Sequence, residues 1–265
     1  MLKLELDHFT FGWIVPTLAY AMSVVGSILG LRCTVHARAS RWREGWLAAG
    51  AVALGGAGIW TMHFTAMLGF SIPGKRIRYD VPMTALSAVV AIVVVWLGLA
   101  IVVRGRPASL TLPLGGAITG CGVAAMHYIG MDAMNTNVSM EYNPALVAVS
   151  VVIAVVASTA ALWFVGHVHG FGATIGAALI MGLAVSGMHY TGMASMSAHQ
   201  RDHISTPVGA EPFLMFLPVI LAITLITMVL IILVGVAEID EANSPHPHRG
   251  RDRRSGHRAG TVGKG

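Results

Sequence analysis

Seven long apolar runs, separated by shorter polar or charged segments, follow one another along the chain. Each run exceeds the roughly 18 apolar residues that indicate a helix able to cross a bilayer. We therefore expect seven transmembrane helices, over residues 12–31, 46–69, 83–103, 110–131, 144–165, 171–195 and 213–236. The pattern predicts an all-α integral membrane protein.

The segments outside these runs divide the chain into three parts. Residues 1–11 form a short external N-terminal segment, and residues 12–236 form one seven-span membrane domain. Residues 237–265 are rich in Arg, Pro, His and Gly, with too few apolar residues to fold alone. We expect this last part to be a disordered basic cytoplasmic tail.

A six-residue element recurs near the C-terminal end of the second, fourth and sixth runs. Its common form is Met-His-aromatic-x-small-Met, and its copies span residues 62–67, 126–131 and 188–193. The copies start 64 and 62 residues apart, so the chain carries a long internal repeat. We expect three two-helix repeats followed by a seventh span.

Composition agrees with a membrane protein and excludes other classes. Hydrophobic residues make up 55% of the chain and charged residues 11%. The pI near 9.6 does not indicate a nucleic-acid partner, because the arginines flank the spans or crowd the tail. Cys33 and Cys121 are too few and too separate to form a disulfide framework. The lipid bilayer is the partner that this composition predicts.

Lysine and arginine are distributed unequally between the two sides of the predicted bundle. Twelve lie on the side that holds residues 32–45 and the tail, and five lie on the opposite side. The positive-inside rule then places the N-terminus outside and the C-terminus in the cytoplasm. All three motifs come to lie near the outer face, at similar depth.

The motif-bearing runs are also the glycine-rich ones. Small residues let membrane helices approach closely, whereas surfaces rich in Val and Ile suit lipid. We expect the second, fourth and sixth helices to form an inner set, with the odd-numbered helices facing lipid. Three parallel inner helices would bring His63, His127 and His189 toward one another.

Each motif places an imidazole and a thioether on one helical stripe, because residues four apart share a face. The pairs are His63 with Met67, His127 with Met131, and His189 with Met193. Thioether sulfur is a soft ligand that selects Cu(I), and imidazole binds copper, zinc, iron or nickel. Copper is therefore the predicted cofactor. Its predicted ligands are His63, His127, His189, Met62, Met67, Met126, Met131, Met188 and Met193.

Other interpretations of the motif residues remain open. A single Met in a span is usually packing filler, and a single His often joins neighbouring helices. Ionisable residues within spans are nevertheless rare and usually functional. Tyr128 and Tyr190 fit an aromatic belt at the membrane interface as well as a role at the site.

Polar residues beyond the motifs have two interpretations as well. Asp80 and Asp132 fit either partners that orient an imidazole or ordinary interface carboxylates. His8, His199 and His203 lie on the outer side, where they are either an access point for metal or merely solvated.

A resemblance to a known family covers residues 8–235. It rests on the element Met188-His189-Tyr190-Thr191, on the earlier Gly58-Ile59-Trp60 and Tyr79-Asp80, and on the spacing of the three copies. On these features the sequence resembles the MHYT family of bacterial membrane sensor domains. The resemblance implies a protein of the bacterial cytoplasmic membrane that senses a diatomic gas, such as oxygen, carbon monoxide or nitric oxide, or redox state. It further implies that Met and His residues near the outer face hold copper for this purpose.

Two positions depart from the family's pattern. Phe64 replaces Tyr in the first copy, and Ile129 replaces Thr in the second, so tyrosine is not an obligatory ligand. Family members often carry a fused signalling module, whereas 29 residues follow the last predicted span. We therefore expect a stand-alone member that passes its signal to a separate cytoplasmic partner.

We expect a membrane-embedded sensor that binds copper and is not an enzyme. The alternative is a copper-handling protein that transports or delivers the metal, because the same ligands serve either role. A redox enzyme is disfavoured, since no second cofactor motif or acid–base cluster is visible in the sequence. A transport route needs polar residues through the bilayer, and mostly Gly, Ala, Val and Ile precede the motifs. That difference favours the sensor.

Overall fold

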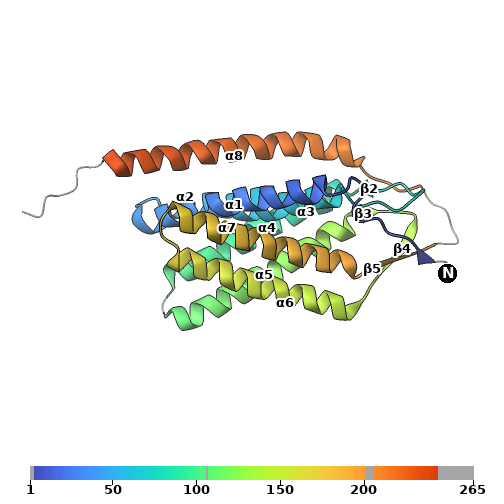
Figure 1. The fold of residues 1–265 in the computed structure, drawn as a ribbon, viewed down its shortest axis with the longest axis horizontal. Helices are drawn as coiled ribbons and strands as arrows, with labels where there is room; N and C mark the ends of the chain where they lie inside the picture. The colour runs from blue at the N-terminus through green and yellow to red at the C-terminus, as the bar shows by residue number, and fades with distance from the viewer. Residues whose placement is uncertain (1–2, 106, 201–205, 244–265) are drawn as a thin grey trace, which may run out of the picture.

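The computed structural model describes residues 3–105, 107–200 and 206–243, and within them seven helical spans lie side by side (Figure 1). Six of the spans are single helices: α1 Ile14–Ala39, α4 Val81–Arg104, α5 Ala108–Asp132, α6 Pro144–His167, α7 Phe171–Ala194 and α8 Pro212–Asn243. The second span is continuous but has three parts: α2 Arg43–Ala51, the π-helix η1 Val52–Trp60 and α3 Thr61–Met67. The predicted all-α, seven-span fold is confirmed.

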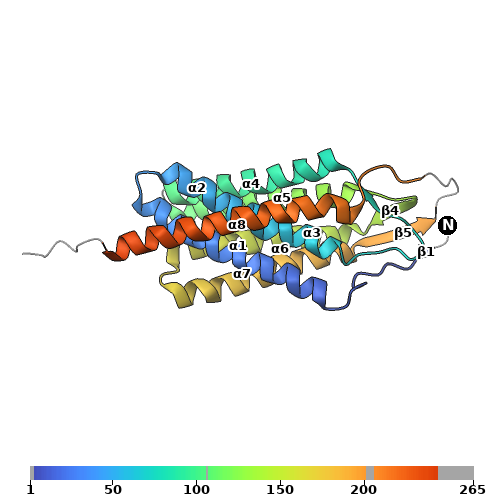
Figure 2. The same cartoon turned by 90° about the horizontal axis from the view of Figure 1, so that it is seen from above.

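The three two-helix repeats close into a ring. Each of the six spans from α1 to α7 packs against the next one along the chain, and α7 packs against α1. Helix α8 lies outside this ring, against α1 and η1, as Figures 1 and 2 show. The ring thus has approximate threefold order, which the eighth helix interrupts on one side.

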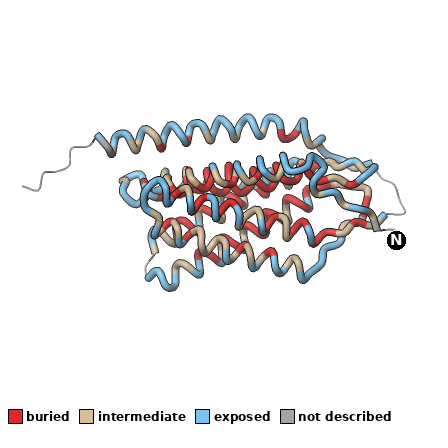
Figure 3. Tube along the Cα trace, in the orientation of Figure 1, coloured by how far each residue is buried: buried red, intermediate tan, exposed pale blue. Residues whose placement is uncertain are grey.

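The three motif-bearing spans are not equally buried. The expectation that they form an inner set, with the odd-numbered helices facing lipid, is therefore wrong. Over its most apolar window, 83% of the second span is buried, against 39% for α5 and 33% for α7. Helices α1 and α4 are buried to similar extents, at 39% and 33%. The physical reason is that α8 covers the outer side of the second span, whereas α5 and α7 keep one face exposed (Figure 3).

Glycines mark the closest helix contacts around the ring rather than a separate inner layer. Gly26 of α1 faces Gly58 of η1 so closely that a Cβ atom on Gly26 would collide with the Gly58 backbone. Likewise, a Cβ atom on Gly55 would lie 2.7 Å from the carbonyl oxygen of Ala91 on α4. Glycine in these spans therefore lets backbones of adjacent helices touch.

The π-helix is a feature of the first repeat only, because α5 and α7 are regular α-helices. A π-helix bonds each N–H five residues back and is rare except in short, frequently functional stretches. Here the Thr61 hydroxyl also donates to the carbonyl oxygen of Gly56, five residues earlier, over 2.9 Å. The π-helix ends at Trp60, three residues before His63.

Short strands gather at one end of the bundle, which we call the motif end (Figure 1). Strand β5, Met196–Gln200, pairs antiparallel with β1, Lys3–Leu4, and with β4, Val138–Tyr142. A second pair joins β2, Arg78–Tyr79, to β3, Met134–Asn135. The sequence predicts only polar loops here. The pairing ties the N-terminal segment and the loops after the three motifs together.

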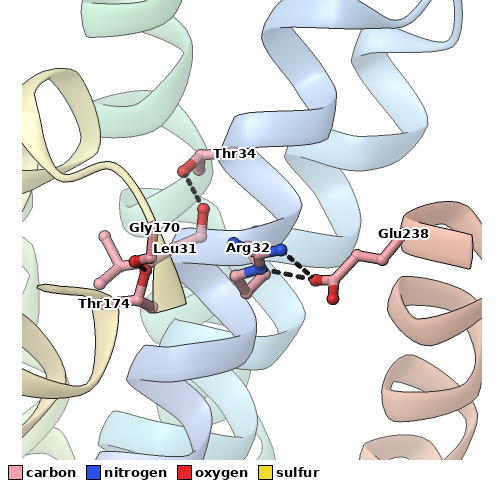
Figure 4. Close-up of polar contacts among 6 residues, drawn as sticks. All are labelled: Leu31, Arg32, Thr34, Gly170, Thr174 and Glu238. Atoms are coloured by element: carbon pink, nitrogen blue, oxygen red, sulfur yellow. Dashed lines mark hydrogen bonds and ion pairs between the residues drawn. The ribbon is translucent and has the colours of Figure 1, made fainter. Parts of the chain in front are cut away.

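An ion pair joins α8 to the ring at the end opposite the motifs. The Arg32 Nε of α1 donates to Glu238 Oε1 over 2.6 Å, as Figure 4 shows. The helix runs past the predicted boundary at residue 236 to Asn243, and Glu238 lies in this extension. Residues 244–265, most of the predicted disordered tail, lie outside the described residues.

Candidate metal centre

Three histidines meet inside the ring at the motif end. His63 of α3, His127 of α5 and His189 of α7 are each buried, with at most 1% of the residue exposed. Their Nδ1 atoms converge: His63 lies 3.0 Å from His189 and 3.0 Å from His127, and the remaining pair is 3.3 Å apart. The predicted convergence of the three motifs is confirmed.

This triangle of nitrogens is not a satisfied hydrogen-bond network. In a neutral imidazole, each ring nitrogen is either a donor or an acceptor, but not both. A closed ring of three such atoms always contains one pair of equal character, two donors or two acceptors. No choice of tautomers therefore satisfies all three contacts. At best, one N–H is shared between two acceptor nitrogens, which leaves two weakened hydrogen bonds and one acceptor–acceptor contact.

A cation at the centre of the triangle removes this conflict, because all three nitrogens then point lone pairs at one positive charge. Three nitrogens of a tetrahedral site, with metal–nitrogen bonds of roughly 2.0–2.1 Å, lie about 3.3–3.4 Å apart. The separations of 3.0–3.3 Å come close to that geometry. The imidazole donor set suits copper or zinc better than magnesium or calcium. The residues present fit a transition-metal ion.

The outer edge of each imidazole is held by packing instead of hydrogen bonding. When Nδ1 binds a metal, Nε2 carries the proton and usually donates to a carboxylate or carbonyl oxygen. All three Nε2 atoms are buried, and none has a hydrogen-bond partner within the described part of the chain. The orientation of the rings therefore depends on the groups that pack against Nε2.

Two of those groups are glycines of the neighbouring repeat. A Cβ atom on Gly130 would collide with Nε2 of His63, and one on Gly192 would collide with Nε2 of His127. Both glycines stand three residues after their own motif histidine. The sequence interpretation treated them as packing residues of the spans and missed this cradle. Their repeated position after the histidine was the available signal.

The six predicted methionine ligands are all buried. The structure places five of them, Met67, Met126, Met131, Met188 and Met193, in the main apolar core. Met62 belongs to a separate cluster with Ala19 of α1 and Ala66. The meeting atoms of the centre are the three imidazole nitrogens, so coordination by thioether sulfur stays a prediction.

The aromatic residue after each histidine flanks the centre without reaching into it. Phe64 and Tyr128 each lie edge-on to the preceding histidine, with ring centroids 4.6 Å and 5.0 Å away. Tyr190 repeats this arrangement at 5.0 Å, and its ring also stacks on Phe9. The Tyr128 hydroxyl instead shares a 2.6 Å hydrogen bond with Ser150 of α6. These contacts agree with the expectation that tyrosine is not an obligatory ligand.

The carboxylates do not orient the imidazoles in this structure. Asp80 caps helix α4, because its Oδ1 accepts from the backbone N–H of Met83 over 2.9 Å. Neither Asp80 nor Asp132 reaches a histidine Nε2, since those atoms lack partners among the described residues. Of the two interpretations that the sequence left open, the interface role describes Asp80.

The histidines of the motif end outside the triad differ in their surroundings. His8 lies beside the ring of Phe70, and burial lowers its pKa against the opposing effect of Asp7. It lines an open pocket of about 340 Å³ together with Glu5 and Met196. His199 faces Glu141 at 3.7 Å. His203 lies outside the described residues.

Comparison with known proteins agrees with this architecture. The MHYT family repeat, described as "Bacterial signalling protein N terminal repeat", matches residues 56–115, 120–178 and 182–239. The chain belongs to the MHYT family. Each matched segment begins within a motif-bearing span, before its histidine, and continues into the helices that follow.

Similar MHYT proteins include two from Pseudomonas aeruginosa. The bifunctional diguanylate cyclase/cyclic di-GMP phosphodiesterase MucR is 37% identical over 193 residues, which are 70% of this chain and 28% of the relative. The cyclic di-GMP phosphodiesterase NbdA is 38% identical over 170 residues, 62% of this chain and 21% of the relative. The signaling protein YkoW of Bacillus subtilis is 29% identical over 205 residues, 73% of this chain and 25% of the relative.

The chain thus spans about a quarter of the length of these relatives. No solved structure matches it. Family membership, together with the seven apolar spans, establishes a multi-pass bacterial membrane protein of the signalling type.

Proposed function

We propose that this MHYT protein is a membrane sensor whose buried histidine triad holds one copper ion. The observation that carries the proposal is the convergence of three Nδ1 atoms within 3.0–3.3 Å of one another. Three neutral imidazole nitrogens cannot all be paired one to one by hydrogen bonds, whereas all three can bind one cation. Bound copper would supply a redox-active, ligand-binding centre. His63, His127 and His189 would hold the ion, with the motif methionines as further soft donors.

The protein around the triad performs the remaining tasks of such a sensor. The core methionines and the flanking rings of Phe64, Tyr128 and Tyr190 exclude water from the triad. A dry surrounding strengthens electrostatic interactions at the centre. Under this proposal, the stimulus is a diatomic gas or a change in redox state, as the resemblance implies.

The direction of signalling follows from the proposed orientation, in which the motif end faces outward and the Arg32–Glu238 end faces the cytoplasm. Two relatives are named for synthesis or hydrolysis of cyclic di-GMP. We propose that the sensed state is passed, at the cytoplasmic end, to a signalling partner of that kind. Helix α8 is the candidate connection. The centroid of the aromatic ring of its residue Phe216 lies 5.3 Å from that of Phe64, the residue after His63.

The rival function is copper transport or delivery, which the same ligands would support. A transport route needs polar groups that continue across the membrane from the site. The space directly below the triad is instead lined by residues such as Ile59, Val123 and Val185. This apolar floor supports a sensor in preference to a transporter.

Copper content decides whether the triad holds the metal. We expect purified wild-type protein, reconstituted with Cu(I) under reducing conditions, to carry one copper ion per chain. The variants His63→Ala, His127→Ala and His189→Ala should each lose most of it, because a site left with two imidazoles in a dry core binds weakly. His36→Ala is the matched control, since His36 is also buried but packs against Trp46, with ring centroids 4.7 Å apart. Equal copper in wild type and all variants, or none in the wild type, contradicts the proposal.

A further inference from the structure

A small cavity lies directly beneath the histidine triad, on the axis of the ring. Its lining includes Ile59, Val123 and Val185. Each of these residues stands four positions before its motif histidine, at the same place in all three repeats. Four residues are about one helical turn, or roughly 6 Å of rise. The three side chains therefore form a layer one turn below the nitrogens, and the cavity continues below that layer.

The cavity is suited to an apolar occupant of very small size. The space open to the centre of a water-sized sphere is about 30 Å³, and one water molecule needs roughly 10–15 Å³ by the same measure. A stable internal water needs two to four polar partners. The polar side chains in the lining are Thr119 and Ser158, and the Thr119 hydroxyl already donates to the carbonyl oxygen of Val94 over 3.3 Å. The space should stay dry, as apolar cavities do.

One wall of the cavity is formed by residues that are not fully buried within the bundle. The lining there consists of small residues of α6, among them Ala157, Ser158 and Ala161. All three are only half-buried, as is Val185 on the neighbouring helix α7. Small side chains at a half-exposed helix seam leave a short path between the cavity and the hydrocarbon core of the bilayer.

The opposite wall reaches the candidate metal centre. Met188 lines the cavity, is 2% exposed, and directly precedes His189. It is also one of the predicted soft ligands of the copper ion. An occupant of the cavity would therefore contact a residue of the motif itself, without passing through the strands that cover the motif end.

We propose that this cavity binds a neutral apolar diatomic molecule, which enters from the bilayer core between α6 and α7 and reaches the triad from below. Apolar gases dissolve better in hydrocarbon than in water, so a sensor with this opening samples the membrane and not the aqueous phase. Binding in the cavity requires no metal. The meaning of that binding for sensing rests on the proposed function of the triad.

Dissolved dioxygen is the probe for binding, because it is paramagnetic and speeds the relaxation of nearby methyl groups. The protein is prepared without copper, in a lipid nanodisc, with methyl-labelled Val and Leu. We expect the buried methyl groups of Val123 to relax several-fold more strongly under oxygen pressure than those of Leu47, which is equally buried but does not line the cavity. Equal enhancement at Val123 and Leu47 would overturn the proposal.

The second part of the test uses variants in which a larger side chain fills the cavity. Ala157→Leu adds bulk inside it, whereas Ala117→Leu makes the same change on an exposed position of α5. Enhancement at Val123 should fall to the Leu47 level in the first variant and remain in the second. Ala161→Val is a milder filling variant for the case in which overpacking by Ala157→Leu prevents folding. Undiminished enhancement in a folded filling variant contradicts the proposal.

The copper-loaded protein tests the route. Oxidation of bound Cu(I) by dioxygen should be slowed several-fold in Ala157→Leu, with copper content unchanged and with Ala117→Leu as the control. An unchanged rate together with lost enhancement at Val123 would refute the route. Absence of copper in the wild type would refute the proposed function, while the relaxation measurement on copper-free protein would still decide the cavity.

Discussion

The Nε2 edge of His127 rests directly against Gly192, a glycine of the next repeat that stands three residues after His189. Gly130 supports Nε2 of His63 in the same way. Each of these histidines is thus positioned by the repeat that follows it in the chain. The three motifs are therefore not independent sites. One motif supplies the histidine nitrogen, and the next motif supplies the glycine surface that orients the imidazole.

The first prediction concerns this cradle. Gly192→Ala should displace the His127 ring, lower the free energy of unfolding by about 1–3 kcal/mol through overpacking, and reduce copper affinity. Gly187→Ala is the control on the same helix, because a Cβ atom there meets nothing within 4 Å. Thermal melting and copper titration of both variants provide the measurement. If Gly192→Ala matches Gly187→Ala in both, the cradle does not position the ring.

The second prediction separates a metal site from a packing cluster. In copper-free protein, His189→Leu should leave the melting temperature unchanged or raise it, because it removes an unsatisfied buried nitrogen that costs about 1–3 kcal/mol. Copper at a hundredfold excess over its dissociation constant should stabilise the wild type by roughly 2.7 kcal/mol. We expect that gain to disappear in the variant.

The matched control for this experiment is His36→Leu, which removes a buried histidine that packs against Trp46 and takes no part in the triad. Its Nε2 is also buried without a partner among the described residues, so copper-free stability should change in the same direction as in His189→Leu, while the stabilisation by copper is kept. A large loss of stability in copper-free His189→Leu would mean that the triad is a structural network.

The third prediction concerns orientation. A membrane-impermeant thiol reagent applied to intact cells should label Ser139→Cys, in β4 at the motif end, and should not label Ser40→Cys, at the opposite end. Both substitutions are made after Cys33 and Cys121 have been replaced by serine. The reverse labelling pattern would place the triad near the cytoplasmic face and contradict the proposed direction of signalling.

A fourth prediction addresses the tail. Truncation after Glu238 retains the ion pair with Arg32 and removes the basic C-terminal residues. Copper content should be unchanged, because the three converging nitrogens lie at the other end of the bundle. A clear loss of copper would indicate that a histidine of the tail, which lies outside the described residues, contributes a ligand. The tail histidines are His246, His248 and His257.

The ion pair itself offers a fifth, independent prediction. Arg32→Ala should lower the free energy of unfolding by no more than about 1 kcal/mol, since Arg32 and Glu238 are both partly exposed and solvent screens such pairs. Copper content should again stay constant. A double-mutant cycle with Glu238→Ala isolates the coupling between the two side chains. A coupling well above this range would mean that α8 is anchored chiefly by the pair.

The sequence was sufficient to predict the spans and the meeting of the histidines. Length and hydropathy define a helix long enough to cross the membrane, and a motif repeated at the same end of three parallel helices fixes a common depth for His63, His127 and His189. The π-helix could not be predicted in this way. Its residues Val52–Trp60 read as an ordinary apolar helix, and the wider turn depends on contacts such as that between Gly58 and Gly26 of another span.

The strands escaped prediction for a related reason. Lys3 pairs with His199, which lies almost two hundred residues away, and β1 contains only two residues. Segments this short carry no period-two pattern, so their extended conformation depends on long-range pairing. The unequal burial of the motif-bearing spans was likewise invisible, because it depends on where α8 packs after the ring has closed.

That the number of repeats is odd affects how the histidine nitrogens can pair with one another. A ring of two or four equivalent imidazole nitrogens can alternate donor and acceptor around its whole circumference and be complete as a neutral structure. A ring of three cannot, whichever tautomers it adopts. An even number of motifs could therefore pair its nitrogens completely between helices. With three, the nitrogens cannot be paired one to one, so two of them must share a partner unless a cation binds all three. The favourable place for a positive charge at the axis thus follows from the number of repeats and not from any single residue.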